Sequence, residues 1–443
     1  MAGTTIVRAR ILHTPRDPFK HDDALETYED GGLAFDAGGR ITALGEFARV
    51  RRESPGAELL DARGALLLPG LVDTHVHWSQ LGIIGAMGME LLDWLRERTL
   101  PEEARLADVT YARATARDFL RLLAASGTTT ALVFGSHFQD AQHAFLEEAA
   151  RSGLRIASGL VVSDRYLLPE FHHTPDAAYD AGRELARRWH GQGHLRYAVS
   201  PRFSISCSEA MLEACGALGG ELDGALVTSH LNENRDEVRA VAERFPWADH
   251  YLETYDRHGL VGARTVLAHN VHPGDAELEQ LAHRRASVAH CPASNAFLGS
   301  GIFPMRRHLD HGVRFALGTD VGAGTGLGML KEGLMAYQAQ LLTPDGVRLS
   351  PAHLLWLATR AGADALGLGD VTGDLRPGKE ADFVLIRPRA GGALEATLER
   401  AEGTEDALGA LFALAREDSI AEVRVAGERV GPEPAGSPLH SPA

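Results

Sequence analysis

The chain has 443 residues, of which 44% are hydrophobic and 23% are charged. These fractions are typical of soluble globular proteins and exclude a chain that is disordered throughout. Its 60 acidic and 44 basic residues give a formal net charge of -16, which argues against nucleic acid or an anionic membrane as the main partner.

Three cysteines are scattered along the chain without a C-x-x-C pair, which excludes a disulfide framework and a cysteine-based zinc site and favours a reducing compartment. The first residues lack the basic and apolar regions of a signal peptide, and no apolar run reaches the ~18 residues of a membrane span. The 21 histidines are many for this length and are the first indication of a chemical function.

Residues 1–68 are predicted to form short strands joined by turns. Apolar or alternating patterns lie at residues 5–11, 32–36, 41–44 and 65–68. Residues 37–40 have the composition of a hairpin turn, and Pro69-Gly70 ends this part of the chain. We expect these strands to belong to a small β-domain.

From residue 69 to residue 378, short apolar strands alternate with longer helical segments. The strand candidates are residues 71–76, 128–134, 155–161, 195–200, 225–230, 265–269, 286–290 and 314–318. Such alternation predicts a parallel sheet. Eight units over about 310 residues favour a closed (β/α)₈ TIM-type barrel, with an open doubly wound sheet as the alternative.

Helices are expected between these strands at residues 110–125, 177–190, 208–218, 235–243 and 275–284. Strand patterns return at 381–386 and 421–430, on either side of one helical stretch, 393–416. We expect residues 1–68 and 379–430 to pair into a small β-sandwich domain formed from both termini, beside the barrel domain, 69–378. Residues 431–443 carry four prolines and are predicted to be a disordered tail.

Five side chains with metal-binding atoms follow predicted barrel strands. His75 and His77 end the first strand, His230 the fifth and His269 the sixth, and Asp320 follows the eighth. Two residues apart on a strand, His75 and His77 share one face. Because the carboxyl ends of barrel strands meet at one mouth, we expect all five side chains to converge there.

Imidazole and carboxylate ligands suit Zn²⁺ or Fe²⁺. A metal ion with an open position lowers the pKa of its water toward ~7, so the pattern predicts a hydrolase. Glu233 follows His230 by three residues and is placed to shuttle protons. The alternative for Glu233 is a structural role as an exposed acid at the start of helix 235–243. Asp320 has a second possible role, in which it accepts a hydrogen bond from the metal-bound hydroxide.

Other motifs keep structural alternatives. His137 and His290 also end strands, where pocket lining and simple packing are both open. His172 and His173 lie in a polar loop and are expected to be solvated or part of a lid. Residues 322–326 are rich in glycine but lack the Lys-Ser/Thr pair of a phosphate-binding loop, so we interpret them as a loop at the mouth of the barrel.

At these residues the sequence resembles the amidohydrolase superfamily and, within it, the guanine deaminase family. The superfamily motifs are PGLVDTHVH at 69–77 and LRPGKEADF at 375–383. The narrower similarity lies in WSQ at 78–80, PRFSISCS at 201–208, SHLNENRDEV at 229–238, HCPASN at 290–295 and GTDV at 318–321. The resemblance extends over about residues 5–430 in the order of the family.

The resemblance implies one Zn²⁺ per subunit, with Fe²⁺ as the alternative. The implied metal ligands are His75, His77, His230, His269 and Asp320. The implied catalytic residues are Glu233, Asp320 and His269, and the implied purine-binding residues are Gln80, Arg202, Phe203 and His230. Ser200 stands where relatives with two metals carry a lysine, which favours a mononuclear site.

The implied reaction converts guanine and water to xanthine and ammonia in purine catabolism, in the cytoplasm and usually by a homodimer. One alternative is a deaminase or chlorohydrolase of the same superfamily that acts on an s-triazine, cytosine or an adenosine-type compound. The Gln80 and Arg202 pair distinguishes these substrates. A second alternative, a barrel that has lost its activity, is disfavoured because every expected ligand and Glu233 are present.

Overall fold

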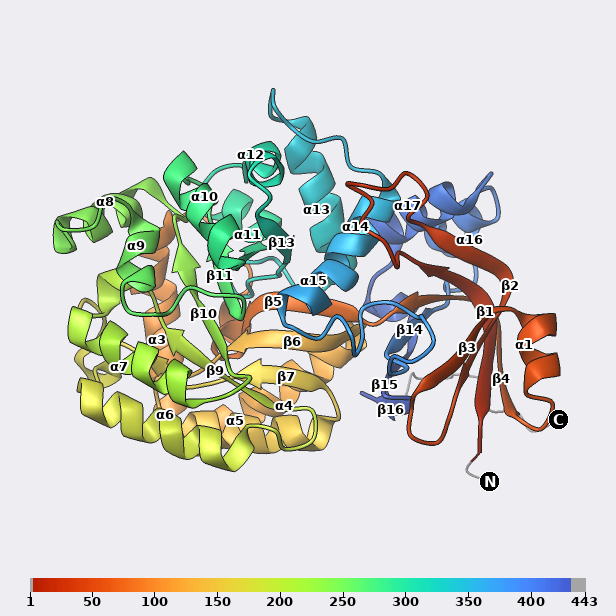
Figure 1. Cartoon of the computed structure of the whole chain (residues 1–443), viewed down its shortest axis with the longest axis horizontal. Coiled ribbons are helices and arrows are strands. Elements are labelled where there is room, and N and C mark those ends of the chain that lie inside the picture. The colour runs from red at the N-terminus through yellow and green to blue at the C-terminus, as the bar shows by residue number, and fades with distance from the viewer. Residues whose placement is uncertain (1–2, 432–443) are drawn as a thin grey trace.

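The computed structural model describes residues 3–431 and consists of a parallel barrel beside a smaller β-domain (Figure 1). All but the first residue of the predicted tail, 431–443, lies outside the described residues. Within the described part, no helix is both long enough and apolar enough to cross a membrane.

Eight parallel strands follow one another around the barrel in chain order, which confirms the predicted (β/α)₈ fold and excludes the open sheet. They are β5 (Leu71–His77), β6 (Thr128–Phe134), β7 (Arg155–Ser158), β9 (Arg196–Pro201), β10 (Leu226–Leu231), β11 (Thr265–His269), β12 (Ser287–His290) and β13 (Arg314–Leu317). A short additional strand, β8 (Val161–Val162), pairs with β9. Each predicted strand lies at one of these positions.

The barrel closes between β5 and the residues that follow β13. The Asp320 backbone N–H donates to the His75 carbonyl at 2.8 Å, and the His77 N–H donates to the Val321 carbonyl at 2.9 Å. The Thr74 hydroxyl donates to the Leu317 carbonyl at 2.8 Å. This seam therefore brings the first and last predicted metal ligands together.

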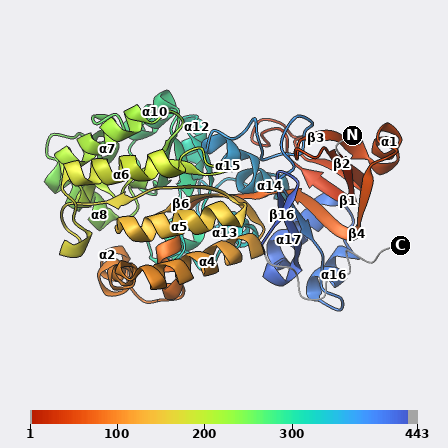
Figure 2. The ribbon, with the colours of Figure 1, turned by 90° about the horizontal axis from the view of Figure 1, so that it is seen from below.

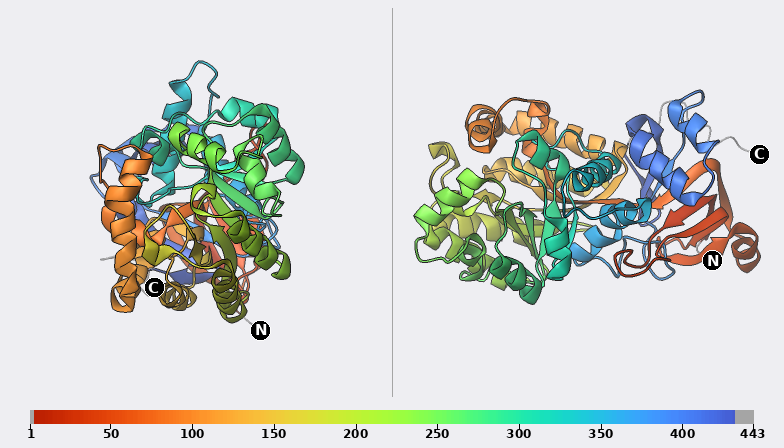
Figure 3. Two further views of the ribbon diagram at one scale, coloured as in Figure 1. Left: turned by 90° about the vertical axis from the view of Figure 1, so that its left-hand side faces the viewer. Right: turned by 90° about the horizontal axis from the view of Figure 1, so that it is seen from above.

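Helices surround the barrel strands (Figure 3, left). The longer ones are α4 (Val109–Ala125), α5 (Gln139–Ser152), α6 (Pro175–Trp189), α7 (Glu209–Glu221), α8 (Arg235–Arg244), α10 (Asp275–Arg284) and α13 (Met329–Leu341). The shorter ones are α9 (Tyr251–Asp256), α11 (Pro292–Phe297), α12 (Met305–Asp310), α14 (Pro351–Ala358) and α15 (Arg360–Ala365). In α4, Asp108 caps the first turn and the buried residues recur every three or four positions, as in an amphipathic helix.

A run of short helices between β5 and α4 has no counterpart among the predicted elements. It comprises η1 (Trp78–Ile83), α2 (Leu91–Trp94), η2 (Leu95–Thr99), α3 (Leu100–Ala104) and η3 (Arg105–Ala107). Its members are too short to show a helical period over several turns, which explains why the sequence pattern did not reveal them.

The β-domain contains one seven-stranded sheet in the order β16-β15-β14-β4-β1-β2-β3. Its strands are β1 (Thr5–His13), β2 (Glu26–Phe35), β3 (Ile41–Glu46), β4 (Glu58–Pro69), β14 (Phe383–Ile386), β15 (Ile420–Val425) and β16 (Glu428–Val430), and α1 (Phe47–Glu53) packs beside it. The C-terminal β14 pairs antiparallel with the N-terminal β4. This pairing confirms that both ends of the chain build one β-domain.

The predicted helix 393–416 is two helices, α16 (Ala393–Leu398) and α17 (Thr404–Leu414), which lie beside the terminal strands (Figure 2). Gly403 stands in extended backbone before α17, where it interrupts the helical path. The domain boundaries at 68/69 and 378/379 stay predictions.

A buried ion pair joins the barrel to the β-domain. Arg155, the first residue of β7, donates from Nε to Asp382 Oδ2 at 2.6 Å and from Nη2 to Asp382 Oδ1 at 2.9 Å. The Asp382 side chain is fully buried, and Glu380 Oε2 accepts a further bond from Arg155 at 2.5 Å. The guanidinium is thus held by two carboxylates from the segment that precedes β14 (Phe383–Ile386).

We expect Asp382→Ala to lower the free energy of unfolding by about 3–5 kcal/mol, because it leaves a buried guanidinium without its main partner. Chemical denaturation measures this change. Glu53→Ala removes an exposed pair with Arg49 and is the control, with an expected loss below about 0.5 kcal/mol. Equal losses in the two variants would contradict the structural role of the buried pair.

Candidate metal centre and substrate pocket

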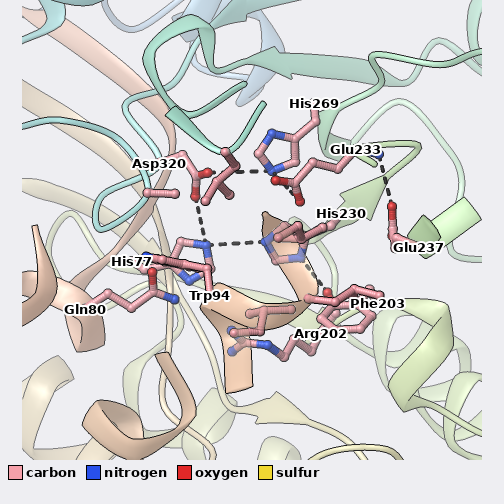
Figure 4. A pocket seen from close by; sticks show the side chains of 15 residues that line it. His77, Gln80, Trp94, Arg202, Phe203, His230, Glu233, Glu237, His269 and Asp320 are labelled. Carbon is pink, nitrogen blue, oxygen red and sulfur yellow. Dashed lines mark hydrogen bonds and ion pairs between the residues drawn. The ribbon is translucent and has the colours of Figure 1, made fainter. Parts of the chain in front are cut away.

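The five predicted ligands come together at the carboxyl ends of the barrel strands, and Figure 4 shows four of them, His77, His230, His269 and Asp320. His77 Nε2 lies 3.1 Å from His75 Nε2, 3.4 Å from His230 Nε2 and 3.2 Å from Asp320 Oδ1. Asp320 Oδ1 is also 3.3 Å from His75 Nε2, and its Oδ2 is 3.7 Å from His269 Nε2. Three strands, β5, β10 and β11, and the loop after β13 thus direct donor atoms to one point.

This donor set fits a divalent metal ion. One atom each of His75, His230, His269 and Asp320 lies within 4.8 Å of the others, and His77 adjoins three of these four. Ligand atoms about 2.0–2.2 Å from Zn²⁺ stand roughly 3–4 Å apart in a tetrahedral arrangement. His269 Nε2 is buried and makes no hydrogen bond within the described residues, as expected of an atom reserved for a metal.

Second partners orient two of the imidazoles. His230 Nδ1 lies 2.6 Å from the Arg202 carbonyl oxygen, and His269 Nδ1 lies 3.0 Å from Asn295 Oδ1. Because these oxygens can only accept, each Nδ1 carries the proton and each Nε2 presents a lone pair to the centre. The rings are therefore fixed in the tautomer that a metal ion requires.

Burial keeps three of the histidines neutral. It lowers the pKa of His77 and of His269 to about 4, and it lowers the pKa of His230 well below the usual value. Burial alone would raise the pKa of Asp320, but hydrogen bonds with His75 and His77 outweigh it and hold that pKa well below its usual range. At pH 7 the carboxylate of Asp320 thus lies among the uncharged imidazoles of His77, His230 and His269.

Asp73 braces the barrel seam behind the ligands. Its carboxylate accepts from the Thr319 N–H at 3.0 Å, from the Thr319 hydroxyl at 2.5 Å and from the His75 N–H at 3.1 Å. It is fully buried, and burial raises its pKa to about 6. These bonds fix the residues adjoining Asp320 and His75, so Asp73 positions the ligands without offering an atom to the metal.

Glu233 lies inside the pocket and not on the surface at the start of a helix. It is 4% exposed, and its Oε2 is 3.4 Å from His269 Nε2. Its backbone N–H donates to Glu237 Oε2 at 3.1 Å, within the capping box that begins α8. Burial, and then the charge of Asp320, raises the pKa of Glu233 well above its usual value. The side chain is therefore suited to hold a proton.

The pocket encloses about 420 Å³, its open mouth included. Its lining residues are His77, Gln80, Leu91, Leu92, Trp94, Leu95, Arg202, Phe203, His230, Glu233, Glu237, His269, Leu298, Asp320 and Ala323. All of the predicted site residues except His75 are among them, and the Nε2 atom of His75 lies 3.1 Å from that of His77, which is in the lining. Leucines and Trp94 form apolar walls while Gln80 and Arg202 form a polar corner, an arrangement that suits a flat heterocycle with a polar edge.

Sequence reasoning missed several residues of this site. Glu103 holds the polar corner, Glu237 binds the backbone of Glu233, Asn295 orients His269, and Trp94 forms a wall. Glu237 and Asn295 stand within motifs that the sequence analysis identified, and their position just after a barrel strand could have marked them as site residues. Glu103 and Trp94 lie in the run of short helices, where no sequence pattern marks a site residue.

The remaining histidines lie outside the pocket lining. His137 is buried and stacks on Phe171 at 4.5 Å between ring centroids. His290 is buried and stacks on Phe303 at 4.3 Å. Both arrangements favour the packing alternative. His172 is exposed on its loop.

The comparisons with known proteins agree with this geometry. The model of the amidohydrolase family matches residues 66–430. A probable guanine deaminase of Deinococcus radiodurans is 56% identical over 427 residues, which cover 95% of this chain and 97% of that one. The structure of E. coli guanine deaminase superimposes with a TM-score of 0.93 at 36% identity, covering 96% and 99% of the two chains.

A third relative bears on the ligand. The structure of guanine deaminase from C. acetobutylicum, described with guanine bound in the active site, superimposes with a TM-score of 0.88 at 26% identity. The match covers 97% of this chain and all of that one (100%).

We expect Asn295→Ala to weaken Zn²⁺ binding about 10- to 100-fold, because His269 loses the partner that fixes its tautomer. Competition with a chelator measures the affinity. Asn234→Ala removes the same side chain from the cap of α8, where it touches no predicted ligand, and is expected to keep the wild-type affinity. An unchanged affinity in Asn295→Ala would show that Asn295 does not tune the centre.

Proposed function

The chain belongs to the amidohydrolase family, and we propose that its activity is the hydrolytic deamination of guanine to xanthine and ammonia. One observation carries this proposal: a polar corner of Gln80 and Arg202 shares a pocket with Glu233 and the converging histidines. The similarity to guanine deaminases over nearly the whole chain supports the same substrate.

We propose one Zn²⁺ per subunit as the cofactor, with Fe²⁺ as the alternative. The residues that would hold it are His75, His77, His230, His269 and Asp320. When bound, the ion lowers the pKa of water toward ~7 and so supplies a nucleophile at neutral pH.

Arg202 and Gln80 would select and orient the base. Arg202 Nε is buried and has no hydrogen-bond partner among the described residues, so it is a donor available to a ligand. A guanidinium suits the O6 and N7 acceptors of guanine, whereas adenine carries an amino group in place of O6 and leaves that donor unpaired. Phe203, which is in the pocket lining, would flank the ring.

Glu233 would move the protons of the reaction. Its carboxylate takes a proton from the attacking water and delivers it to ring N3 while the oxygen bonds to C2. Asp320, whose Oδ2 lies 3.7 Å from His269 Nε2, would accept a hydrogen bond from the oxygen that bonds to C2. His269, with its Nδ1 proton on Asn295, would act through its Nε2 lone pair as a ligand. The oxygen now bonded to C2 still carries the second proton of the water. Asp320 would accept this proton and pass it to the amino group, and cleavage of the C2–N bond then releases ammonia and leaves xanthine with the first proton at N3.

The cellular setting is also a proposal. Cys207, Cys215 and Cys291 are free and buried, which is compatible with a reducing compartment, and we propose a cytoplasmic enzyme of purine catabolism. A homodimer is proposed from the family resemblance.

The function is tested by measuring the metal content of the purified protein and then assaying its deaminase activity. Ammonia release from guanine is expected, with little or none from adenine, cytosine or melamine. Removal of the metal by a chelator should abolish the activity, and added Zn²⁺ should restore it. Turnover of another heterocycle in place of guanine would overturn the proposal.

We expect Glu233→Gln to lower kcat by roughly 10²- to 10⁴-fold while metal content stays the same, because the amide cannot carry the proton. Steady-state kinetics and metal analysis measure the two quantities. Glu243→Gln changes an exposed residue of the same helix region and should keep the wild-type kcat. Full activity of Glu233→Gln would remove the proton-transfer role.

We expect Arg202→Ala to raise the KM for guanine roughly 10- to 100-fold, since a charged donor to the base is lost. Initial rates over a range of guanine concentrations give this value. If KM stays at the wild-type level, Arg202 does not contact the substrate.

A further inference from the structure

Glu103 lies behind the polar corner of the pocket and has no role in the mechanism above. It stands on α3 and is 3% exposed. Its Oε1 accepts from Gln80 Nε2 at 2.9 Å and from the Ser79 hydroxyl at 3.3 Å. Arg202 Nη1 donates to both oxygens, at 3.1 and 2.8 Å. One buried carboxylate thus touches both proposed base-binding side chains.

These contacts restrict how Gln80 presents its amide. An ionised carboxylate can only accept, so the Gln80 amino group must face Glu103. The Gln80 Oε1 atom in turn accepts from the Gly322 N–H at 3.0 Å. Both ends of the amide are therefore assigned, and the group cannot rotate by half a turn without losing two hydrogen bonds.

The same carboxylate balances the positive charge of Arg202 and fixes the rotation of its guanidinium. The guanidinium is 2% exposed, and a buried cation without a counter-charge is strongly disfavoured. Because both bonds to Glu103 use Nη1, Nε and Nη2 are the donors left for a ligand. The charge of the corner is balanced, which suits a neutral heterocycle.

We propose that Glu103 is a positioning residue that determines specificity for the substrate edge by fixing Arg202 and Gln80 together. The inference rests on the proposed function, since it names what those two side chains recognise. Within the described part of the chain, Glu103 makes no hydrogen bond or ion pair with Glu233 or with the predicted metal ligands, so its effect falls on binding of the base and not on the proton transfers.

Glu103→Gln is the main test. The amide keeps the size of the side chain, but it removes the counter-charge of Arg202 and can itself donate, so Gln80 is free to turn. We expect the KM for guanine to rise roughly 10- to 100-fold, with a much smaller change in kcat and an unchanged metal content. Glu103→Asp keeps the charge with a shorter reach and should give an intermediate KM.

Glu102→Gln is a matched control on the neighbouring residue. Glu102 is 7% exposed, but its carboxylate binds Arg105 at 2.8 Å and the Tyr111 hydroxyl at 2.5 Å and touches neither Arg202 nor Gln80. Any general loss of stability in α3 should appear in both variants as a lower Tm. The rise in KM should appear only in Glu103→Gln.

A double variant separates positioning from packing. If Glu103 acts in part through Arg202, then Glu103→Gln raises the KM of Arg202→Ala by a smaller factor than it raises the wild-type KM, because only its contact with Gln80 remains to be lost. Fully additive effects, or a wild-type KM in Glu103→Gln, would overturn the inference. Failure of the wild-type protein to deaminate guanine would instead reject the proposed function. The wild-type protein therefore tests the function, and the Glu103 variants test the inference.

Discussion

The seam that closes the barrel is the constraint on which the site depends. Between β5 and the residues after β13, backbone hydrogen bonds join His75 to Asp320 and His77 to Val321. Asp73 reinforces the seam from inside the barrel through Thr319. Because ligands stand on both sides of it, the bonds that complete the fold also set the distance between the metal-binding atoms. The same hydrogen bonds therefore close the sheet and assemble the metal-binding centre.

Much of this arrangement could be predicted from the sequence. Each barrel strand is an apolar run of a few residues, and the chemical side chains follow those runs directly, so the rule that strand ends meet at one mouth was enough to bring His230 and His269 together with His75. Glu233 could be placed for the same reason. Pairing of the two chain ends followed from strand patterns that had no partner nearby.

The polar corner could not be predicted in the same way. Glu103 meets Arg202 across 99 positions of sequence, and it stands on a helix of five residues that has no period to recognise. Its partners are set by packing of the segment between β5 and α4 over the barrel mouth, which is a tertiary effect. The break between α16 and α17, residues 399–403, was also missed, because Gly403 is the only glycine in it and no proline marks it.

The passage from the β-domain into the barrel has a consequence for evolution of the chain. Only Gly70 separates β4 from β5, and a methyl group there would overlap the Thr129 side chain, while its N–H is held by the Asp382 carbonyl. The connection between the terminal sheet and β5, the first strand that carries ligands, therefore has no flexible linker. The terminal sheet is therefore not an appendage that recombination can exchange freely: any replacement must deliver the chain to Leu71 at the same height and direction, or the register of His75 and His77 shifts with it.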